Sequence, residues 1–434
     1  MKNLNALIII ILLGIGIISC NKEEFGEVTK NESLTTNQFY LPISDALNIG
    51  LKQFEIRKEK NNTLKSRYIS PDFRTKKIKE AKTFKKEGTD LFHIINYEGG
   101  GFVIISADKR VTPVLAYSES SEFDGEELPG ISEWISAIST GILKAKKELK
   151  EPRDKELRLW EIYTGEKEIG PSMIEPDDPC SSCNTSWSIS TGQFVDAVAV
   201  WTQGGQYSWY CPNDGGCSCD RKPAGCGPVA MAMVMNYYHY PNTTMTFNGE
   251  TLLTNYPMPR TIPYNCNYPS DLNHRQVAML IRLCGSFAGA NYGVLGNCAT
   301  WTYPGNINNA LATMGFSNGG NWNGLDDCYQ RVINDLKTYH PIILTGTLNM
   351  VNLNDAHIWV ADGYDGYRYD SPIEYYDEFG HIQCSCITYG RDMISMNWGH
   401  GGSGNGFYLA NYSFTDGSGN TYDTYLRALT GIRP

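Results

Sequence analysis

Lysine is nearly absent from the C-terminal part of this 434-residue chain. Residues 171–434 contain two lysines, Lys222 and Lys337, and hold 11 Lys and Arg in total against 21 Asp and Glu. That part therefore carries the whole formal charge of −10, and residues 1–170 are neutral. Because phosphate backbones bind to basic surfaces, the composition argues against nucleic acid as a partner.

Long apolar runs are also scarce. The unbroken run of small and apolar residues 6–18 follows Lys2 and ends before Ser19 and Cys20, which predicts an N-terminal signal over residues 1–20. The stretch "IISCNKEE" resembles a bacterial lipoprotein signal, in which a lipidated Cys20 would anchor the protein to a membrane at the cell surface or in the periplasm. A plain secretory signal is the alternative. No other stretch approaches ~18 consecutive apolar residues, so we expect the remainder to be exported and soluble.

Cysteine pairs that could ligate a metal are few: Cys180/Cys183, Cys217/Cys219 and Cys384/Cys386. Twelve of the 13 cysteines lie between Cys180 and Cys386, and one residue separates the cysteines of the pairs 217/219 and 384/386. Such spacing does not suit zinc, whereas dense cysteines in an exported chain indicate disulfides. We expect no metal and no cofactor. Without Cys226, 11 cysteines lie in this region, so at least one more lacks an intramolecular partner.

Composition divides the chain after the signal into four parts. Residues 21–36 are polar and predict a tether. Residues 37–165 predict a small α+β domain with a hairpin around a Gly-rich turn and an amphipathic helix after Gly130. Residues 166–185 are polar and Pro-rich, which is typical of a linker. Residues 186–434 predict a second α+β domain, in which a helical layer packs on an antiparallel sheet.

The expected elements of the second domain lie in a simple order, helices before strands. Hydrophobic periodicity predicts helices over residues 227–239, 271–288, 305–315 and 326–339, and strands over residues 341–347, 357–364, 386–398 and 406–414. The segment "DSPIEYYDEFGHIQCSC" between two of these strands predicts an inserted hairpin.

The stretch "PAGCGPVAMAMVMNYYHYP" places Cys226 between two glycines, just ahead of a helical pattern. Gly225 permits a tight entry, and Pro228 is favoured in a first helical turn. Free N–H groups and the helix dipole at this end favour a thiolate and can also hold a developing oxyanion. We expect Cys226 to be a nucleophile; the alternative is one half of a disulfide.

A thiolate nucleophile needs a base, and His357 is the best placed of the histidines. It opens the strand "HIWVADGY", 131 residues after Cys226, within the roughly 130–150 residues found in papain-like enzymes. Asn397 is the first asparagine after it and could orient the imidazole, while Trp398 could shield that hydrogen bond. Asp362, Asp365 or Asp370 could orient the ring instead. A structural role for His357 is the alternative to catalysis.

The glycines at 399, 401 and 404 have the spacing of a dinucleotide-binding loop. They lead into a strand rather than a helix, and no βαβ pattern surrounds them, so that interpretation fails.

Four segments in this order resemble the streptopain-like cysteine peptidases, a secreted branch of the papain-like fold. They are "WTQGGQYSWYCP", "GCGPVAMAMVMNYYHYPN", "DAHIWVADGYDG" and "MNWGHGGSGNGFYL". The segment "LFHIINYEGGGFVIISADKRVTPVLAYSE" resembles the family's propeptide. The resemblance spans most of residues 195–434 and extends to residues 37–160.

The resemblance implies a papain-like cysteine endopeptidase made as a zymogen, with its own pro-domain as inhibitor and proteins or peptides as substrates. It implies Cys226 as nucleophile, His357 as general base and acid, Asn397 as orienter and Trp398 as its shield. Gln203 would complete an oxyanion hole beside the backbone N–H of Cys226. We further expect Gly225, Gly399, Gly401 and Gly402 to line the substrate cleft, and processing to occur between about residues 158 and 185. A transferase or amidase on the same fold, or a surface binding protein, are the rival functions.

Overall fold

The computed structural model describes residues 38–61, 76–165, 180, 186–253, 256–293, 298–346, 356–410 and 426–434. The expected signal, the tether with Cys20 and most of the expected linker lie outside the described residues. Within the described ranges, no helix combines the length and apolar character needed to cross a membrane.

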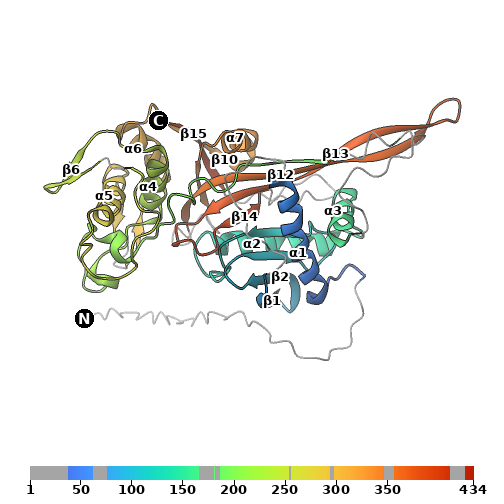
Figure 1. The fold of residues 1–434 in the computed structure, drawn as a ribbon, viewed down its shortest axis with the longest axis horizontal. Helices are drawn as coiled ribbons and strands as arrows, with labels where there is room; N and C mark the ends of the chain where they lie inside the picture. The colour runs from blue at the N-terminus through green and yellow to red at the C-terminus, as the bar shows by residue number, and fades with distance from the viewer. Residues whose placement is uncertain are drawn as a thin grey trace, which may run out of the picture.

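The N-terminal region, residues 38–165, is a curved sheet covered by helices on both faces (Figure 1). Neighbouring residues of its hairpin point to opposite faces: Ile94 and Ile104 pack toward α2, whereas Ile95 and Ile105 pack toward α1 and α3. The predicted hairpin and amphipathic helix are confirmed. The elements are α1 (Ile43–Asn61), β1 (Ile78–Lys86), β2 (Thr89–Tyr97), β3 (Phe102–Ser106), β4 (Val114–Ser118), α2 (Ile131–Glu148) and α3 (Asp154–Thr164).

The C-terminal region, residues 186–434, separates its helices from its strands, as predicted. Helices α4, α5 and α6 gather at one end of the molecule, and the long strands lie beside them (Figure 1). Its helices are α4 (Cys226–Tyr238), α5 (Leu272–Phe287), α6 (Ile307–Thr313) and α7 (Leu325–Lys337), with short 3-10 turns at Gly205–Ser208, Ser218–Asp220 and Pro304–Asn306. Its strands are β5 (Ser186–Ser190), β6 (Met245–Phe247), β7 (Glu250–Leu252), β8 (Asn291–Tyr292), β9 (Thr300–Trp301), β10 (Asn318–Gly324), β11 (Ile342–Gly346), β12 (His357–Tyr376), β13 (Ile382–Asn397), β14 (Gly406–Leu409) and β15 (Arg427–Arg433).

One antiparallel sheet of 11 strands runs through both regions. Its order is β1-β2-β3-β4-β14-β13-β12-β11-β15-β10, and β5 pairs with β12 off this path. The regions join where β14 pairs with β4, with Phe407 opposite Tyr117 and Tyr408 opposite Ala116. The N-terminal region is thus hydrogen-bonded edge to edge with the C-terminal sheet instead of forming a separate unit.

The predicted hairpin insertion is the outer part of β12 and β13. We call residues 368–390 the arm, which projects from the body of the molecule (Figure 1). The two strands stay in register out to Tyr376 opposite Ile382, and β5 adds a third strand at the arm's base. A disulfide joins Cys180 to Cys384 on the arm.

Disulfides account for most of the described cysteines. Besides Cys180–Cys384, Cys217 pairs with Cys298 and Cys219 pairs with Cys266, and Cys386 is also disulfide-bonded. Both one-residue-spaced pairs singled out in the sequence therefore hold disulfides. Cys211, Cys226, Cys284 and Cys328 are free thiols. Among these four, Cys226 is the one that is half-buried, whereas the other three are buried.

Candidate active site

Cys226 is the first residue of helix α4, as the glycine and proline around it predict. Gly225 has φ of 91°, a conformation that side chains other than glycine rarely adopt. The helix behind it is buried on all sides from Gly227 to Asn236, which fixes the position of its first turn.

The Cys226 sulfur lies directly beside the first residues of β12. Its sulfur takes hydrogen bonds from the backbone of Ile358, Gly227 and Cys226 itself, all of which favour the thiolate. Burial has the larger effect and raises the pKa of the thiol, and the Glu133 carboxylate raises it further. In this structure Cys226 is therefore a thiol and not the thiolate that a helix N-terminus alone predicts.

His357 is the first residue of β12 and is adjacent to Ile358, so the fold brings it to the same place as Cys226. Its Nε2–H donates to the carbonyl oxygen of Trp398 at 2.8 Å. Burial and the neighbouring His400, whose ring centroid is 5.0 Å away, lower the pKa of His357 to about 3. The ring is consequently neutral at physiological pH.

Strand β13 ends at Asn397, and Trp398 follows it next to His357, but the Asn397 side chain bonds other groups here. Its Nδ2 donates to the Ala199 carbonyl at 2.8 Å, and its Oδ1 accepts from Gly399 N at 3.4 Å. Trp398 is fully buried, and its ring packs on Trp359 at 5.1 Å between centroids. The structure thus gathers Cys226, His357, Asn397 and Trp398, while the imidazole bonds a carbonyl one residue beyond the expected amide.

The glycine loop that follows Trp398 runs along the segment that contains Gln203. Gly401 N donates to Trp201 O at 3.1 Å, and Gln203 O accepts from Ala224 N at 2.8 Å, two residues before Cys226. Gly399, Gly401 and Gly402 all have positive φ, between 70° and 96°. The glycine loop therefore lies against residues 200–202, and the backbone of Gln203 is bonded to the residue two positions before Cys226.

Segment 122–130 of the N-terminal region lies directly on this site. Its Gly130 contacts the catalytic histidine candidate so closely that an added Cβ would be 2.7 Å from both His357 Cδ2 and Trp398 Cε3. Gly130 N donates to the Glu133 carboxylate, which places this buried charge near the Cys226 sulfur.

The glycine loop is bonded to the same segment at three points. His400 Nε2 donates to Pro129 O at 2.9 Å, Gly404 N donates to Glu122 O at 3.1 Å, and Ser403 Oγ bonds the Asp124 carboxylate. The N-terminal region therefore lies directly against His357, Trp398 and the glycine loop.

Sequence reasoning identified neither Gly130 nor Glu133 nor His400 as part of this site. The dipeptide Pro129–Gly130 signals a helix start, and Glu133 follows as the N3 residue that caps helix α2. These signals are local. They do not indicate that the start of the helix will contact His357, which lies 227 residues further along the chain.

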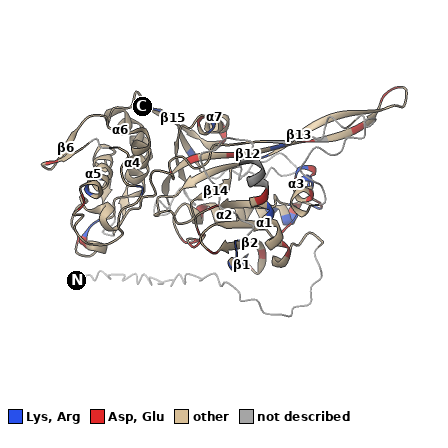
Figure 2. Cartoon of the chain, in the orientation of Figure 1, with Lys and Arg blue, Asp and Glu red and all other residues tan. Residues whose placement is uncertain are grey.

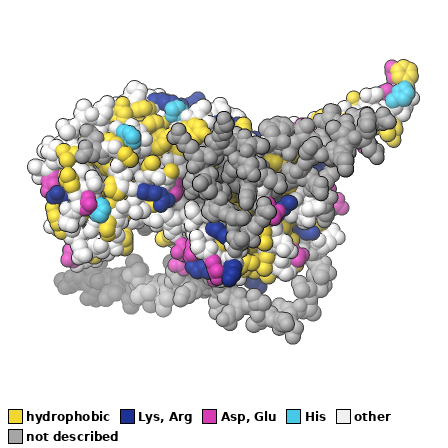
Figure 3. Space-filling model, in the orientation of Figure 1, with side chains coloured by type: hydrophobic (Ala, Val, Ile, Leu, Met, Phe, Trp, Pro, Cys, Tyr) yellow, Lys and Arg dark blue, Asp and Glu magenta, His cyan; other side chains and the backbone are white. Residues whose placement is uncertain are grey.

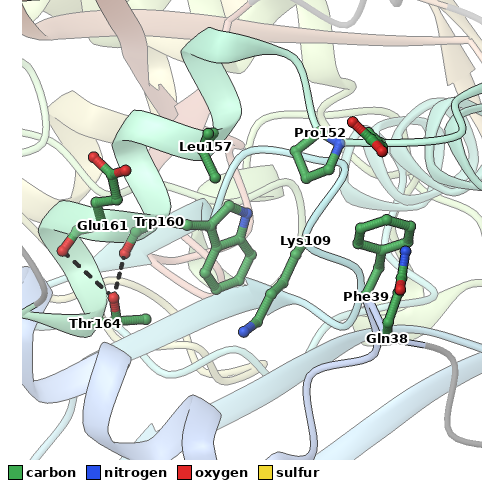
Figure 4. A pocket seen from close by; sticks show the side chains of 9 residues that line it. Gln38, Phe39, Lys109, Pro152, Leu157, Trp160, Glu161 and Thr164 are labelled. Atoms are coloured by element: carbon green, nitrogen blue, oxygen red, sulfur yellow. Dashed lines mark hydrogen bonds between the residues drawn. The ribbon is translucent and has the colours of Figure 1, made fainter.

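A surface hollow of about 370 Å³ lies elsewhere, on the N-terminal region (Figure 4). Phe39, Lys109 and Trp160 project into it, and Glu161 stands at its edge. It shares no residue with the Cys226 site, so it is not the cleft.

Comparisons with known proteins agree with this geometry. Residues 33–142 match the family model of the Spi protease inhibitor, and residues 201–408 match that of the Peptidase C10 family. Streptopain of Streptococcus pyogenes serotype M1 is 23% identical over 385 residues, which cover 80% of this chain and 81% of streptopain.

Two solved structures are also similar. A fragment of Prevotella intermedia prointerpain A, in mutant form, has a TM-score of 0.49 and 19% identity, and the match covers 83% of this chain and 99% of that one. Active wild-type interpain A cysteine protease of the same organism has a TM-score of 0.35 and 18% identity, and the match covers 60% and 100%.

An inhibitor domain followed by a cysteine peptidase domain, in one chain, defines a cysteine-type endopeptidase made as a zymogen. Within that class, the chain is a streptopain-like cysteine peptidase with an N-terminal inhibitory pro-domain. Its substrates are proteins, and its own pro-domain inhibits it.

Proposed function

We propose that Cys226 is the nucleophile of this endopeptidase and His357 its general base and acid. The observation that carries the proposal is the sulfur of Cys226, which lies at the tip of α4 and accepts a bond from the residue after His357. Asn397, at the end of β13, orients the His357 imidazole, and the buried Trp398 shields their hydrogen bond from water.

In the reaction, the Cys226 thiolate attacks the scissile carbonyl carbon, and the His357 imidazolium gives its proton to the leaving amine. Water, whose proton His357 takes, then attacks the thioester and releases the carboxylate product. The Cys226 N–H and the Gln203 side chain hold the oxyanion in both steps. Gly225, Gly399, Gly401 and Gly402 give the substrate backbone room to approach.

The zymogen is inactive for two reasons: the pro-domain blocks the site, and Cys226 and His357 are held in unreactive protonation states. With segment 122–130 on the site, burial favours a neutral thiol and a neutral imidazole, so the reactive ion pair is absent. Release of the pro-domain removes Gly130 and the Glu133 carboxylate and admits water. The imidazole N–H can then pass from the Trp398 carbonyl to the amide oxygen of Asn397.

Processing would separate the two regions between about residues 158 and 185. The division into a signal (1–20), tether (21–36), pro-domain (37–165), linker (166–185) and catalytic domain (186–434) remains part of this proposal. The similarity to streptopain supports export. The lipoprotein-type sequence at Cys20 supports anchoring at a membrane surface, from which processing would free the catalytic domain.

The test is the purified zymogen with Cys226→Ala, beside Cys211→Ala as a control that removes a buried free thiol outside the site. We expect Cys226→Ala to abolish self-processing and hydrolysis of a fluorogenic peptide, and Cys211→Ala to keep both. Normal maturation of Cys226→Ala, in a preparation free of other proteases, would contradict the assignment. An N-terminal sequence of the mature protein locates the cut.

A further inference from the structure

The strand register gives the arm two distinct faces. Residues directly opposite one another in an antiparallel pair share a face, and successive residues alternate. Tyr369 pairs with Tyr389, Ile373 with Ser385 and Tyr375 with Gln383. The odd-numbered face therefore carries a row of apolar and aromatic side chains. We call this row the aromatic stripe: Tyr367, Tyr369, Ile373, Tyr375, Ile387 and Tyr389.

The inner half of the stripe is covered by helix α3 of the pro-domain. Tyr369 OH donates to the Lys155 carbonyl at 2.9 Å, and the Tyr389 hydroxyl bonds the Asp154 side chain. At the other end of α3, Tyr163 accepts from Arg391 at 2.6 Å. Tyr367 and Tyr369 are 5% and 6% exposed. An amphipathic helix is thus the partner that already lies on this face.

The outer half continues beyond the pro-domain into solvent. Ile373, Tyr375 and Ile387 are 43%, 51% and 38% exposed, and Figure 3 shows apolar side chains at the arm's end. An exposed apolar row on a projecting ribbon is costly, and such surfaces in soluble proteins commonly bind a partner. A two-stranded ribbon is also marginal by itself. Here β5 and the Cys180–Cys384 disulfide brace it.

Charge limits which partner can bind. Residues 369–390 contain Asp370, Glu374, Asp377 and Glu378 and no lysine or arginine. Figure 2 accordingly shows acidic residues toward the arm's end and no basic ones. An anionic membrane or a second copy of the acidic C-terminal region would be repelled. Asp370 and Glu374 lie on the even-numbered face behind the stripe, so they would attract the flanks of a partner rather than its apolar face. A partner with basic flanks is therefore favoured.

We propose that, in the mature peptidase, the aromatic stripe is an exosite that binds an amphipathic helix of a protein substrate, apolar on one face and basic at its flanks. The inference rests on the proposed function, since the site becomes complete when the pro-domain leaves. From Tyr367 to Tyr375 the stripe spans nine residues of β12, roughly 26 Å, which matches a helix of about 18 residues. Binding there would hold the substrate near the cleft at the other end of β12 and β13.

The test compares two fluorogenic substrates of the mature enzyme. One is a short cleavable peptide, and the other carries in addition a designed helix of about 18 residues with leucine on one face and lysine at its flanks. The enzyme variants are the triple change Ile373→Ser, Tyr375→Ser and Ile387→Ser. The matched control is Tyr376→Ser with Ile382→Ser, an exposed pair on the opposite face.

We expect the helix to raise kcat/KM by about tenfold through KM in the unaltered enzyme and in the control. The stripe variant should lose this gain while it hydrolyses the short peptide normally. An equal gain in the stripe variant, or no gain in the unaltered enzyme, would overturn the proposal. Binding of each enzyme form to neutral phosphatidylcholine vesicles is measured as well. A stripe variant that keeps the gain but loses vesicle binding would also overturn the proposal, because the stripe would then bind a membrane instead of a helix. Failure of every form on the short peptide would instead count against the proposed function.

Discussion

Gly130→Ala in the zymogen should release the enzyme from its own inhibition. Gly130 has φ of 86°, where a side chain other than glycine costs about 1–2 kcal/mol. The new methyl group would also be 2.7 Å from His357 Cδ2 and Trp398 Cε3, and such overpacking costs about 1–3 kcal/mol. Together they disfavour the blocked state by about 2–5 kcal/mol. Because about 1.4 kcal/mol is tenfold, the unblocked fraction should rise by about 30-fold to 4000-fold.

The assay follows self-processing and peptide hydrolysis in dilute purified zymogen. Gly88→Ala is the matched control, because Gly88 has φ of 74° in the same pro-domain with no atom within 4 Å of an added Cβ. It introduces similar backbone strain without touching the site. We expect Gly130→Ala to mature at least tenfold faster than Gly88→Ala, with both variants folded by circular dichroism. Equal maturation rates in the two folded variants would refute the blocking role of Gly130.

Two further predictions concern buried charges. Arg391→Ala should lower the free energy of unfolding of the zymogen by about 3–5 kcal/mol in urea titrations, because it removes the cation 3.2 Å from the buried Asp365 carboxylate. Lys52→Ala, which breaks an exposed pair, should cost about 0.5 kcal/mol or less; similar losses would contradict the argument. Burial raises the pKa of Asp362 to about 7, so between pH 4 and pH 7 the folded state holds a proton that the unfolded state has lost. Stability should therefore fall as pH rises through this range, and Asp362→Asn should flatten that slope in melting curves; an unchanged slope would show that Asp362 is not its source.

The parts of the fold that local signals determine were predictable. The helix that begins at Cys226 follows from glycine and proline at its start, and the strand that begins at His357 follows from its apolar run. The arm was expected because the 40 residues from His357 to Asn397 are long for the resembled family and contain a segment with the pattern of a hairpin. In contrast, β1 was not predicted, because five of its nine residues are charged lysine or glutamate and it lies at the sheet edge.

The features that the sequence could not specify depend on contacts between distant segments. The hydrogen bond from His357 to the Trp398 carbonyl joins residues 41 positions apart. The close contact of Gly130 with these two residues joins the N-terminal and C-terminal regions. The protonation of Cys226 also depends on distant contacts. Backbone hydrogen bonds at the helix end lower the pKa of the thiol, whereas burial, together with the Glu133 carboxylate of the pro-domain, raises it by more. The sequence therefore pointed to residues that the fold brings close to one another, Cys226, His357 and Trp398, but it did not specify their resting protonation state.

The most direct test of the account is the pH dependence of Cys226 alkylation by iodoacetamide, followed on the Cys226 peptide by mass spectrometry in the zymogen and in the mature enzyme. Exposure of the helix tip and pairing with imidazolium should give the mature enzyme a thiolate already at pH 5 to 6, and hence rapid labelling there. Burial raises the pKa of the same thiol in the zymogen, so its labelling should be slow and should increase above pH 9. Identical profiles in the two forms, or a mature Cys226 that stays unlabelled at low pH, would contradict the claim that the pro-domain holds this sulfur in its unreactive form.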